Sequence, residues 1–498
     1  MVVWPERLNI DDHLLRQRLK DGDGEAIALR LDTRDVTYAE VDRVASGFAS
    51  MLEDRGVGTG DRVLIVMPDG LEDVAALFGT LRLGAVAVLL NPGLTRTDLG
   101  GIATLARAPA AVVHRRFRAH FDRALASADV SPPPVVMVED GVVIPDLDVP
   151  GHDTSAMDPA MWIFSGGTTG LPKAVVQTHR SFANTTELYG KGVLGLTGDD
   201  VTIAVPKLFF GYALGSSLFF PFSVGASAVL FEDHPSPDAV LSRAERHRAT
   251  VLVNVPSMIN QMLAEPRPRD LASLRVVTSA GEALPETLYH RWLDQFGVEL
   301  LDGLGTAEMW HIFVSNTIGA TRPGTLGRVV PGFEIRVCDE EGDEVPTGDV
   351  GRLWVRGDSL GLGYFENPEA TSEAFRGDWF AGGDLVSIDD EGFVTHRGRA
   401  DDAIKVKGRW FRPQEVESTL LDHPAVRQCA VVAVTDPDGL AKPVAFVVAG
   451  AVTEQELTEW VLAHLEPFKH PRRIHFIDNL PQTHLGKVDR AALKRLAG

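Results

Sequence analysis

The sequence predicts an α/β protein with a large N-terminal domain of helix-covered sheets plus a small β-barrel-like unit, followed by a small α+β C-terminal domain. Over the first two thirds of the chain, short apolar runs alternate with helical patterns, which is typical of parallel sheets covered by helices. From about residue 324 the strands follow one another closely between glycines and acidic turns, which indicates a small antiparallel or barrel-like unit.

Seven apolar runs predict strands of the parallel sheets: RVLIVMP (62–68), GAVAVLL (84–90), AAVVH (110–114), VTIAVP (201–206), SAVLFE (227–232), TVLVNVP (250–256) and LRVVTSAGE (274–282). Three later runs predict the antiparallel unit: FEIRVCD (333–339), GRLWVRG (351–357) and GFVTHRG (392–398). In the tail we expect helices at 413–421 and 454–465, and strands at 429–435, 443–449 and 472–477. These patterns divide the chain into domains at 1–400 and 401–498.

Composition limits the classes of function. The chain has 498 residues and a formal net charge of -21, which argues against nucleic acid as the main partner. The N-terminus has no basic segment followed by an apolar run, and the longest apolar stretches are too short for a bilayer, so we expect a cytoplasmic protein without a membrane partner. Two cysteines, Cys338 and Cys429, exclude a disulfide scaffold or a cysteine-rich metal site. Whether the protein is a monomer or a homodimer stays open.

A glycine- and hydroxyl-rich loop, SGGTTGLPK (165–173), follows the apolar run MWIF. Glycines let backbone N–H groups converge on an anion, and hydroxyls and a lysine add donors and charge, so the loop is suited to phosphate. It is not a Walker loop, because Leu171 and Pro172 separate the last glycine from Lys173, and Ala174 stands where that loop has a hydroxyl. Taken alone, the alternative is a Gly/Thr-rich surface turn.

Two other motifs are typical of different chemistry, but the sequence around them lacks what each of those sites requires. GDSLG (357–361) matches the nucleophile elbow of hydrolases by letter, but Ser359 is followed by glycines and a proline instead of a helix. Glu308 and His311 have the Glu-x-x-His spacing of di-iron bundles, which require two copies, and the chain has one.

Six segments together resemble, in order and spacing, the core motifs of the adenylate-forming superfamily of acyl-CoA synthetases, adenylation domains and luciferases. They are the loop at 165–173, SAGEALP (279–285), DGLGTAEMWHIF (302–313), WFAGGDL (379–385), HRGRADDAIKVKG (396–408) and PQTHLGKVDR (481–490). The resemblance covers nearly the whole chain. KLFFGYALG (207–215) and DGLGTAEMWHIFVSN (302–316) are most similar to benzoate-CoA ligases and related aryl-CoA ligases.

The resemblance implies that a carboxylate attacks the α-phosphorus of ATP, which gives acyl-AMP and pyrophosphate, and that the acyl group then passes to coenzyme A. Phosphate binding is implied for Ser165, Gly166, Gly167, Thr168, Thr169, Gly170 and Lys173, with Thr168 also catalytic. Adenine and ribose contacts are implied for Gly281, Glu282, Ala283, Asp302, Gly303, Thr306, Asp384 and Arg399. Glu308 is implied as a catalytic residue and the ligand of Mg²⁺, which offsets the charge of pyrophosphate.

The same resemblance implies that the C-terminal domain is mobile and that it carries the catalytic lysine, Lys487. This lysine is implied to bridge the carboxylate and the α-phosphate during adenylation. Asp401 matches the hinge about which this domain rotates, and Gly408 lies on the loop that then reaches the acyl-adenylate. One site would therefore serve two half-reactions.

The ring pocket is implied for Phe209, Gly211, Tyr212, Ala213, Gly305, His311 and Ile312. Small residues beside aromatic ones form a flat slot, in which burial of a phenyl ring contributes roughly 2–3 kcal/mol. His311 has both donor and acceptor capacity and is expected to meet a ring hydroxyl or amine, the alternative being a core histidine.

Several residues depart from the superfamily pattern. Ala307 stands where a threonine is usual, and Gly382 and Ala174 also differ. Lys407 and Arg412 stand where many relatives have serines. The added positive charge indicates either binding of the phosphates of coenzyme A or a different acceptor.

The sequence therefore predicts an ATP-dependent aryl-CoA ligase for benzoate or a hydroxy- or amino-benzoate. Transfer of the same acid to a carrier protein, an amine or a hydroxyl, and a non-catalytic nucleotide- or acyl-binding protein, remain as alternatives.

Overall fold

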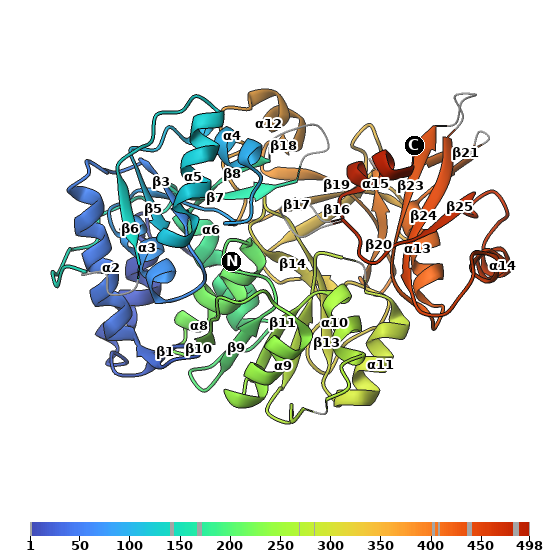
Figure 1. The fold of residues 1–498 in the computed structure, drawn as a ribbon, viewed down its shortest axis with the longest axis horizontal. Helices are drawn as coiled ribbons and strands as arrows, with labels where there is room; N and C mark the ends of the chain where they lie inside the picture. The colour runs from blue at the N-terminus through green and yellow to red at the C-terminus, as the bar shows by residue number, and fades with distance from the viewer. Residues whose placement is uncertain are drawn as a thin grey trace.

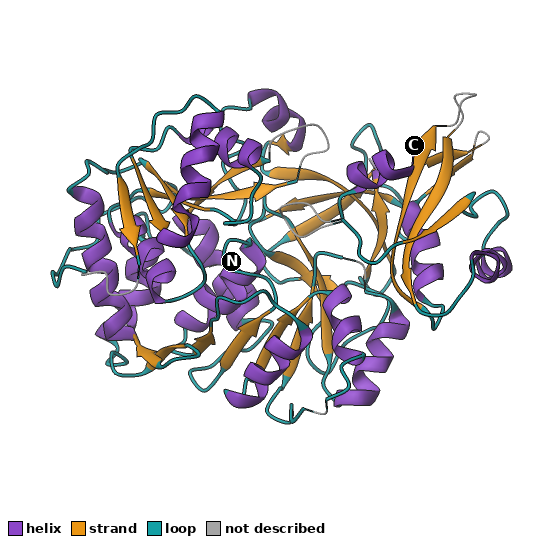
Figure 2. Cartoon of the chain, in the orientation of Figure 1, coloured by secondary structure: helices purple, strands orange, loops and turns teal. Residues whose placement is uncertain are grey.

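Two large sheets with helices on and between them form the N-terminal part of the chain in the computed structural model (Figure 1). The structure describes residues 2–139, 144–166, 172–267, 269–282, 284–400, 404–406, 409–435, 441–481 and 488–497. Figure 2 shows that helices flank the sheets in the N-terminal part, whereas strands predominate between it and the tail. Among the described residues, no helix combines the length and apolar character needed to cross a bilayer.

The first sheet has the strand order β6-β5-β3-β4-β7-β8. Its strands are β3 (Arg62–Val66), β4 (Val86–Leu89), β5 (Ala110–His114), β6 (Val135–Val138), β7 (Pro159–Ser165) and β8 (Lys173–Thr178). Their pairing is parallel except between β7 and β8, which are antiparallel. In β3, Val63 and Ile65 face the central core and Leu64 and Val66 face the outer one, so an unbroken apolar run is buried on both faces.

The second sheet has the order β15-β14-β13-β12-β11-β9-β10-β1-β2. Its strands are β1 (Ile27–Arg30), β2 (Asp35–Thr37), β9 (Val201–Ala204), β10 (Ser227–Val229), β11 (Val251–Asn254), β12 (Val276–Ser279), β13 (Leu300–Gly305), β14 (Ile312–Ser315) and β15 (Arg328–Val329). The strands from β1 through β13 along this order pair in parallel, so β9, β11, β12 and β13 end at one edge. All seven strands predicted for the parallel sheets are confirmed.

Helices cover the outer face of each sheet and fill the space between the sheets. On the first sheet the outer helices are α4 (Arg96–Ala106) and α5 (Arg115–Ser127), and on the second they are α9 (Pro237–Arg246), α10 (Pro256–Leu263) and α11 (Glu286–Phe296). The central core holds α2 (Tyr38–Glu53), α3 (Leu71–Arg82), α6 (His179–Thr185) and α8 (Phe220–Phe222). Shorter helical segments are η1 (Asp12–Arg16), α1 (Gln17–Lys20), η2 (Thr186–Lys191), α7 (Gly211–Leu214), η3 (Gly215–Phe219) and α12 (Pro368–Ala374).

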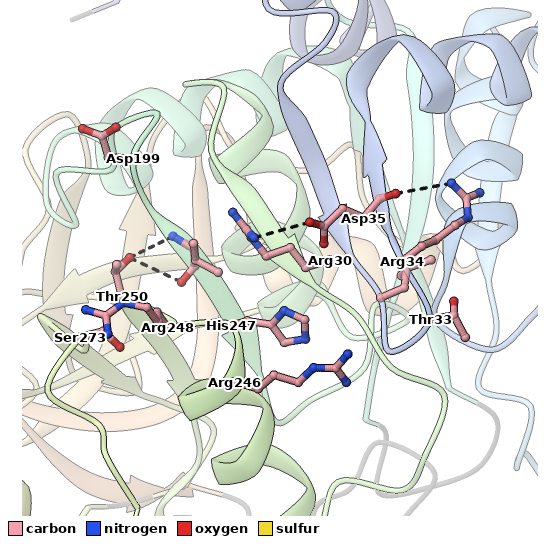
Figure 3. A pocket seen from close by; sticks show the side chains of 12 residues that line it. Arg30, Thr33, Arg34, Asp35, Asp199, Arg246, His247, Arg248, Thr250 and Ser273 are labelled. Atoms are coloured by element: carbon pink, nitrogen blue, oxygen red, sulfur yellow. Dashed lines mark hydrogen bonds and ion pairs between the residues drawn. The ribbon is translucent and has the colours of Figure 1, made fainter.

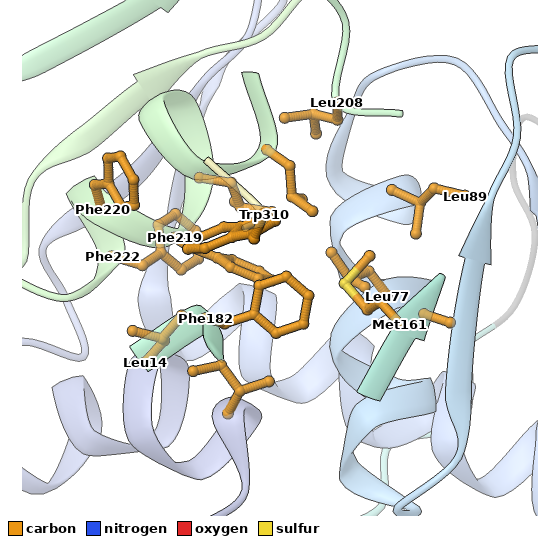
Figure 4. Close-up of a cluster of buried hydrophobic side chains, with 14 of the residues drawn as sticks. Leu14, Leu77, Leu89, Met161, Phe182, Leu208, Phe219, Phe220, Phe222 and Trp310 are labelled. Carbon is orange, nitrogen blue, oxygen red and sulfur yellow. The ribbon is translucent and has the colours of Figure 1, made fainter. Parts of the chain in front are cut away.

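A group of aromatic side chains packs together within the central core (Figure 4). Phe182 of α6 lies 4.6 Å, centroid to centroid, from Trp310, and its ring also meets Phe219 edge to face at 5.3 Å. Leu208 lies in the same cluster. This core therefore supports the segments that carry the 207–215 and 302–313 motifs.

The predicted antiparallel unit is confirmed as a five-stranded sheet of β16 (Glu334–Cys338), β17 (Gly351–Arg356), β18 (Phe375–Arg376), β19 (Trp379–Ile388) and β20 (Val394–Arg399). The tail elements are β21 (Ile404–Val406), β22 (Arg409–Phe411), α13 (Pro413–Leu421), β23 (Val426–Thr435), β24 (Ala441–Ala449), α14 (Glu454–His464), β25 (Arg473–Phe476) and α15 (Arg490–Ala497). Both predicted tail helices and all three predicted tail strands are present. The tail contacts the larger domain through Asn260, whose side chain donates to the Arg427 carbonyl at 2.6 Å.

Candidate active site

The predicted phosphate loop connects the antiparallel strands β7 and β8. Ser165 and Lys173 are register partners, so the strands that flank the loop form a hairpin. The Lys173 ammonium lies 4.9 Å from the centroid of the Tyr364 ring, which places a cation against an aromatic face at the base of the loop. Tyr364 also forms an isolated β-bridge with Val175 of β8, so the tyrosine is fixed to the strand that follows the loop.

Glu308 lies beside this lysine–tyrosine pair, on the loop that connects β13 to β14. Its side chain is 6% exposed, and the Tyr364 hydroxyl donates to its Oε1 atom at 2.7 Å. The Glu308 backbone carbonyl accepts hydrogen bonds from the Gly361 N–H at 2.9 Å and the Gln177 side chain at 3.2 Å. Gln177 belongs to β8, the strand that follows the predicted phosphate loop. Hydrogen bonds therefore join Glu308, the predicted metal ligand, both to β8 and to Tyr364.

The predicted adenine-binding residues lie at the carboxyl ends of β12 and β13. Ser279 and Asp302 are register partners there. Asp302 is 7% exposed, and burial raises its pKa well above the ordinary range against the opposing effect of its hydrogen bonds. Gly303 runs so close to β14 that a Cβ atom would lie 2.8 Å from the Val314 carbonyl oxygen. Glu282 accepts from the backbone N–H and the hydroxyl of Ser257, at 2.9 and 3.1 Å, which ties its loop to α10.

The predicted ribose-binding pair, Asp384 and Arg399, are register partners on β19 and β20. Arg399 Nη1 lies 3.5 Å from Asp384 Oδ2, and His396 Nε2 lies 3.1 Å from Asp384 Oδ1. His396 Nδ1 accepts from the Gln414 amide at 3.2 Å, which leaves its proton on the nitrogen that faces Asp384. Gln414 belongs to α13, so the tail reaches the ribose residues.

His311 is the centre of the predicted ring pocket. It is 3% exposed, and its Nε2 lies 3.0 Å from the Tyr212 carbonyl oxygen and 3.2 Å from the Ser216 hydroxyl. Burial lowers the His311 pKa to about 3, so the ring is neutral at physiological pH. A carbonyl can only accept, so Nε2 carries the proton and Nδ1 is an acceptor, and Nδ1 has no hydrogen-bond partner among the described residues.

Small residues let the backbone pass close to this histidine. A Cβ atom on Gly305 would lie 2.4 Å from the His311 carbonyl oxygen, and one on Gly215 would lie 2.6 Å from His311 Cδ2. Tyr212 is fixed by a 2.6 Å hydrogen bond between its hydroxyl and that of Thr278 on β12. The aromatic rings of Tyr189, Tyr212, Phe220 and Trp310 surround the imidazole at centroid distances of 4.8–5.5 Å.

The structure brings most of the predicted ring-pocket residues together. Gly305 and Ile312 are register partners, and Gly211, Tyr212 and Ala213 form α7 next to His311. Phe209 is different, because its ring packs against Phe210 with centroids 4.5 Å apart and no described contact joins it to His311.

The two competing motifs do not form sites. Ser359 is fully buried, and its hydroxyl is engaged by Thr185 at 2.6 Å, Asn184 at 3.0 Å and the Ser181 carbonyl at 3.1 Å, as in a structural hydrogen-bond network. Glu308 lies in the middle of the β13–β14 loop and contacts Tyr364, whereas His311 is the last residue of the loop and contacts Tyr212. Within the described ranges no group of three or more His, Cys, Asp or Glu side chains is arranged to hold a metal.

A hollow of about 760 Å³ lies away from all of these motifs, against the C-terminal end of α9 (Figure 3). Several arginines line it, but most of them have acidic partners. Arg34 makes a two-pronged contact with Glu40 at 2.7 Å, and Arg30 lies 3.9 Å from Asp35. No predicted site residue lines this hollow, so it does not belong to the candidate active site.

Some predicted residues lie outside the described part of the chain: Gly167, Thr168, Thr169, Gly170, Ala283, Asp401, Gly408 and Lys487. Their roles stay predictions. Other residues of the site were missed from the sequence, namely Tyr364, Tyr189, Thr278, His396 and Gln414. His396 lies inside a quoted motif and Thr278 directly precedes another. Tyr364, Tyr189 and Gln414 lie outside the motifs, and the fold brings them to the site.

Comparisons with known proteins agree with this geometry. The family described as AMP-binding enzyme matches residues 16–365, and the AMP-binding enzyme C-terminal domain matches residues 415–487. The chain is 38% identical to a benzoate–CoA ligase of Thauera aromatica, over 98% of this chain and 96% of that relative. It is 35% identical to a p-hydroxybenzoic acid–AMP ligase of Mycobacterium tuberculosis, over 92% of this chain and 65% of that relative.

Among solved structures, the anthranilate CoA ligase AuaEII in complex with anthranoyl-AMP matches with a TM-score of 0.94 and 34% identity, over 99% of this chain and 98% of that one. The superfamily resemblance of the six motifs, the phosphate-loop hairpin beside Glu308 and the full-length similarity therefore agree, and the chain belongs to the AMP-binding enzyme family.

Proposed function

We propose that the protein activates an aryl carboxylic acid, benzoate or a hydroxy- or amino-benzoate, with ATP and transfers the acyl group to coenzyme A. The observation that carries the proposal is the loop between β13 and β14. Within this loop Glu308 accepts from Tyr364, whose ring faces the Lys173 ammonium, and His311, three residues later, contacts the Tyr212 carbonyl. An acid whose ring occupies the His311 pocket would therefore have its carboxylate near the phosphate-binding residues.

The residues of the phosphate side fit a nucleotide with a bound Mg²⁺ ion. Mg²⁺ takes oxygen ligands, often one or two carboxylates together with substrate phosphates, so a lone Glu308 is a sufficient protein ligand. The Tyr364 hydroxyl would orient its carboxylate by donating to Oε1. When bound, the ion would neutralise charge on the leaving pyrophosphate.

The protein's own groups would divide the remaining work. Lys173 would meet the phosphates, and Asp384 would accept from the ribose hydroxyls, held by His396 and Arg399. Lys487, predicted to bridge the carboxylate and the α-phosphate, would offset the charge that develops at phosphorus. Burial of the aryl ring among Tyr212, Gly305 and His311 would exclude water from the mixed anhydride.

The nature of the acceptor is the second part of the proposal. The benzoate–CoA ligase and anthranilate CoA ligase relatives support coenzyme A. A relative that is a p-hydroxybenzoic acid–AMP ligase supports the alternative, in which another nucleophile takes the acyl group. A non-catalytic binding protein is disfavoured because the sequence retains the predicted catalytic residues Glu308 and Lys487 together with Lys173, Asp384 and Arg399.

The test is product analysis by mass spectrometry after incubation with ATP, Mg²⁺ and benzoate, salicylate, anthranilate or 4-hydroxybenzoate, with and without coenzyme A. We expect aryl-CoA and AMP when coenzyme A is present. Aryl-AMP that accumulates equally with and without coenzyme A would instead support another acceptor, and the absence of both products would contradict the proposal.

A further inference from the structure

Two buried carboxyl groups lie behind the ring pocket, outside the residues assigned above. Asp69 follows β3 and is 8% exposed, and Asp73 lies in the first turn of α3 and is 5% exposed. Acidic residues in a first turn commonly serve the helix dipole. Asp69 has a further contact, because both of its carboxylate oxygens lie within reach of the Leu208 N–H, at 3.3 and 3.4 Å, from a segment 139 residues later in the chain.

The cation nearest to Asp69 is Lys207, whose ammonium lies 4.0 Å from Asp69 Oδ2. The Lys207 side chain is 13% exposed, donates to the Phe231 carbonyl oxygen and lies 3.8 Å from the centroid of the Phe231 ring. The Lys207 ammonium group is therefore held between Phe231, two residues after the end of β10, and the Asp69 carboxylate.

These contacts fix the start of the segment that carries the ring pocket. Leu208, next to the anchored lysine, is 2% exposed in the central core (Figure 4). Four residues further on, Tyr212 provides the carbonyl that accepts from His311 and the hydroxyl that meets Thr278. The segment is thus held at its start by Asp69 and at α7 by His311 and Thr278.

We propose, on the basis of the function proposed above, that Asp69 is a positioning residue for the aryl acid, and that its contacts with Lys207 and Leu208 keep the 207–213 segment in the shape that the ring pocket requires. Asp69 does not touch the substrate. We expect substitution of Asp69 to raise the KM for the acid and to leave the KM for ATP unchanged. The strand after the phosphate loop, β8, is held by contacts with Glu308 and Tyr364.

The ionisation of Asp69 adds a readout. Burial raises its pKa to about 6, while Lys207 and the Leu208 N–H oppose the rise. Burial and the neighbouring Asp69 charge raise the pKa of Asp73 well above its usual range. The other charged groups near Lys207 are Arg243, Asp233 and Glu232.

The sign of the pH effect follows from these pKa values. Above about pH 6 the Asp69 carboxylate is ionised and pairs with Lys207, whereas below it the added proton removes the charge that holds the segment. The KM for the acid should therefore rise as the pH falls through about 6. His311, with a pKa of about 3, does not titrate in this range.

The experiment is steady-state pyrophosphate release by the full chain with saturating ATP, between about pH 5 and pH 8, on the wild type and three variants. Asp69→Asn keeps an acceptor but loses the charge, so the KM for the acid should rise about tenfold at high pH and lose its pH dependence. Lys207→Met removes the cation that lowers the Asp69 pKa, so the midpoint of the wild-type profile should move to higher pH. Asp73→Asn is the matched control, which should keep the wild-type profile because the described contacts of Lys207 and Leu208 are with Asp69 and not with Asp73.

The proposal would be overturned if both Asp69→Asn and Lys207→Met had the wild-type KM for the acid and the wild-type midpoint of its pH profile. So would an equal rise in the KM values for acid and ATP, which indicates general damage to the fold. The acid panel includes acetate and palmitate. A wild type that prefers either of them contradicts the proposed aryl substrate. The pH dependence of the KM for the preferred acid then still tests the positioning role of Asp69.

Discussion

His311 has one ring nitrogen, Nδ1, that the described part of the chain leaves without a hydrogen-bond partner. Because Nε2 donates to the Tyr212 carbonyl, Nδ1 is an acceptor, and we expect it to accept from a hydroxyl or amino group on the substrate ring. His311→Ala should lower kcat/KM about tenfold for hydroxy- or amino-benzoates and less for benzoate. Measuring kcat/KM for benzoate, salicylate, anthranilate and 4-hydroxybenzoate on both proteins checks this, and an unchanged ranking would remove His311 from recognition.

Tyr364 is a second residue whose role depends on one hydrogen bond. Its hydroxyl donates to Glu308 Oε1, while its ring supports Lys173. Tyr364→Phe keeps the ring and removes only the donor, so the Mg²⁺ concentration for half-maximal pyrophosphate release should rise about 10- to 100-fold. The KM for the aryl acid serves as the internal control and should stay the same. An unchanged Mg²⁺ requirement would show that Glu308 does not depend on Tyr364 for orientation.

At the scale of elements, the sequence predicted the strands well and the contacts between them poorly. Runs such as RVLIV in β3 are apolar on both faces because both faces are buried, and that burial is visible in the sequence. The partners of the site residues are not visible there. Tyr364 reaches Glu308, and Gln414 reaches His396, only because sheet topology places distant segments side by side.

The motif residues themselves were predictable from their order and spacing, whereas the local shape was not. The proximity of Gly305 and Gly215 to His311 follows from the close packing of β13, β14 and η3 around one imidazole. No residue type alone signals such an approach. Phe209 was predicted to line the ring pocket because it lies in the motif at 207–215, but its described ring contact is with Phe210.

The connection from β20 to β21 is the element expected to act as the hinge, and Asp401 lies within it. Proline fixes φ and removes a backbone donor, so Asp401→Pro should restrict rotation of the C-terminal domain. We expect adenylation to be retained and transfer to coenzyme A to be blocked. Rates of pyrophosphate release and of aryl-CoA formation, measured in parallel, separate the two steps. Normal turnover to aryl-CoA would show that Asp401 is not the pivot.

At the scale of the whole molecule, the chain has a net charge of -21, yet the proposed substrates are all anions. Long-range attraction therefore cannot drive binding, and local cations must hold each phosphate group. Lys173 is predicted to be such a cation in the large domain, and Lys487 is predicted to be one in the tail. Of the two, Lys487 is predicted to leave the site when the C-terminal domain rotates, so it would serve the first half-reaction only.

Lys487→Ala tests that division of labour. Because Lys487 is predicted to act only in adenylation, its loss should lower pyrophosphate release about 10²–10³-fold. Formation of the thioester from a supplied aryl-adenylate and coenzyme A should remain close to wild type. The two rates are measured separately on the purified variant, and equal loss of both would refute the assignment of Lys487 to the first step alone.

The most direct test of the proposed function is the kcat/KM of the wild type for pyrophosphate release with benzoate and its hydroxy and amino derivatives, compared with acetate and palmitate. The tyrosine rings and the glycines that surround His311 are expected to favour a flat ring over a long alkyl chain. We therefore expect at least one aryl acid to be activated with a kcat/KM well above that of either aliphatic acid. A preference for acetate or palmitate would contradict the aryl pocket, and with it the proposed function.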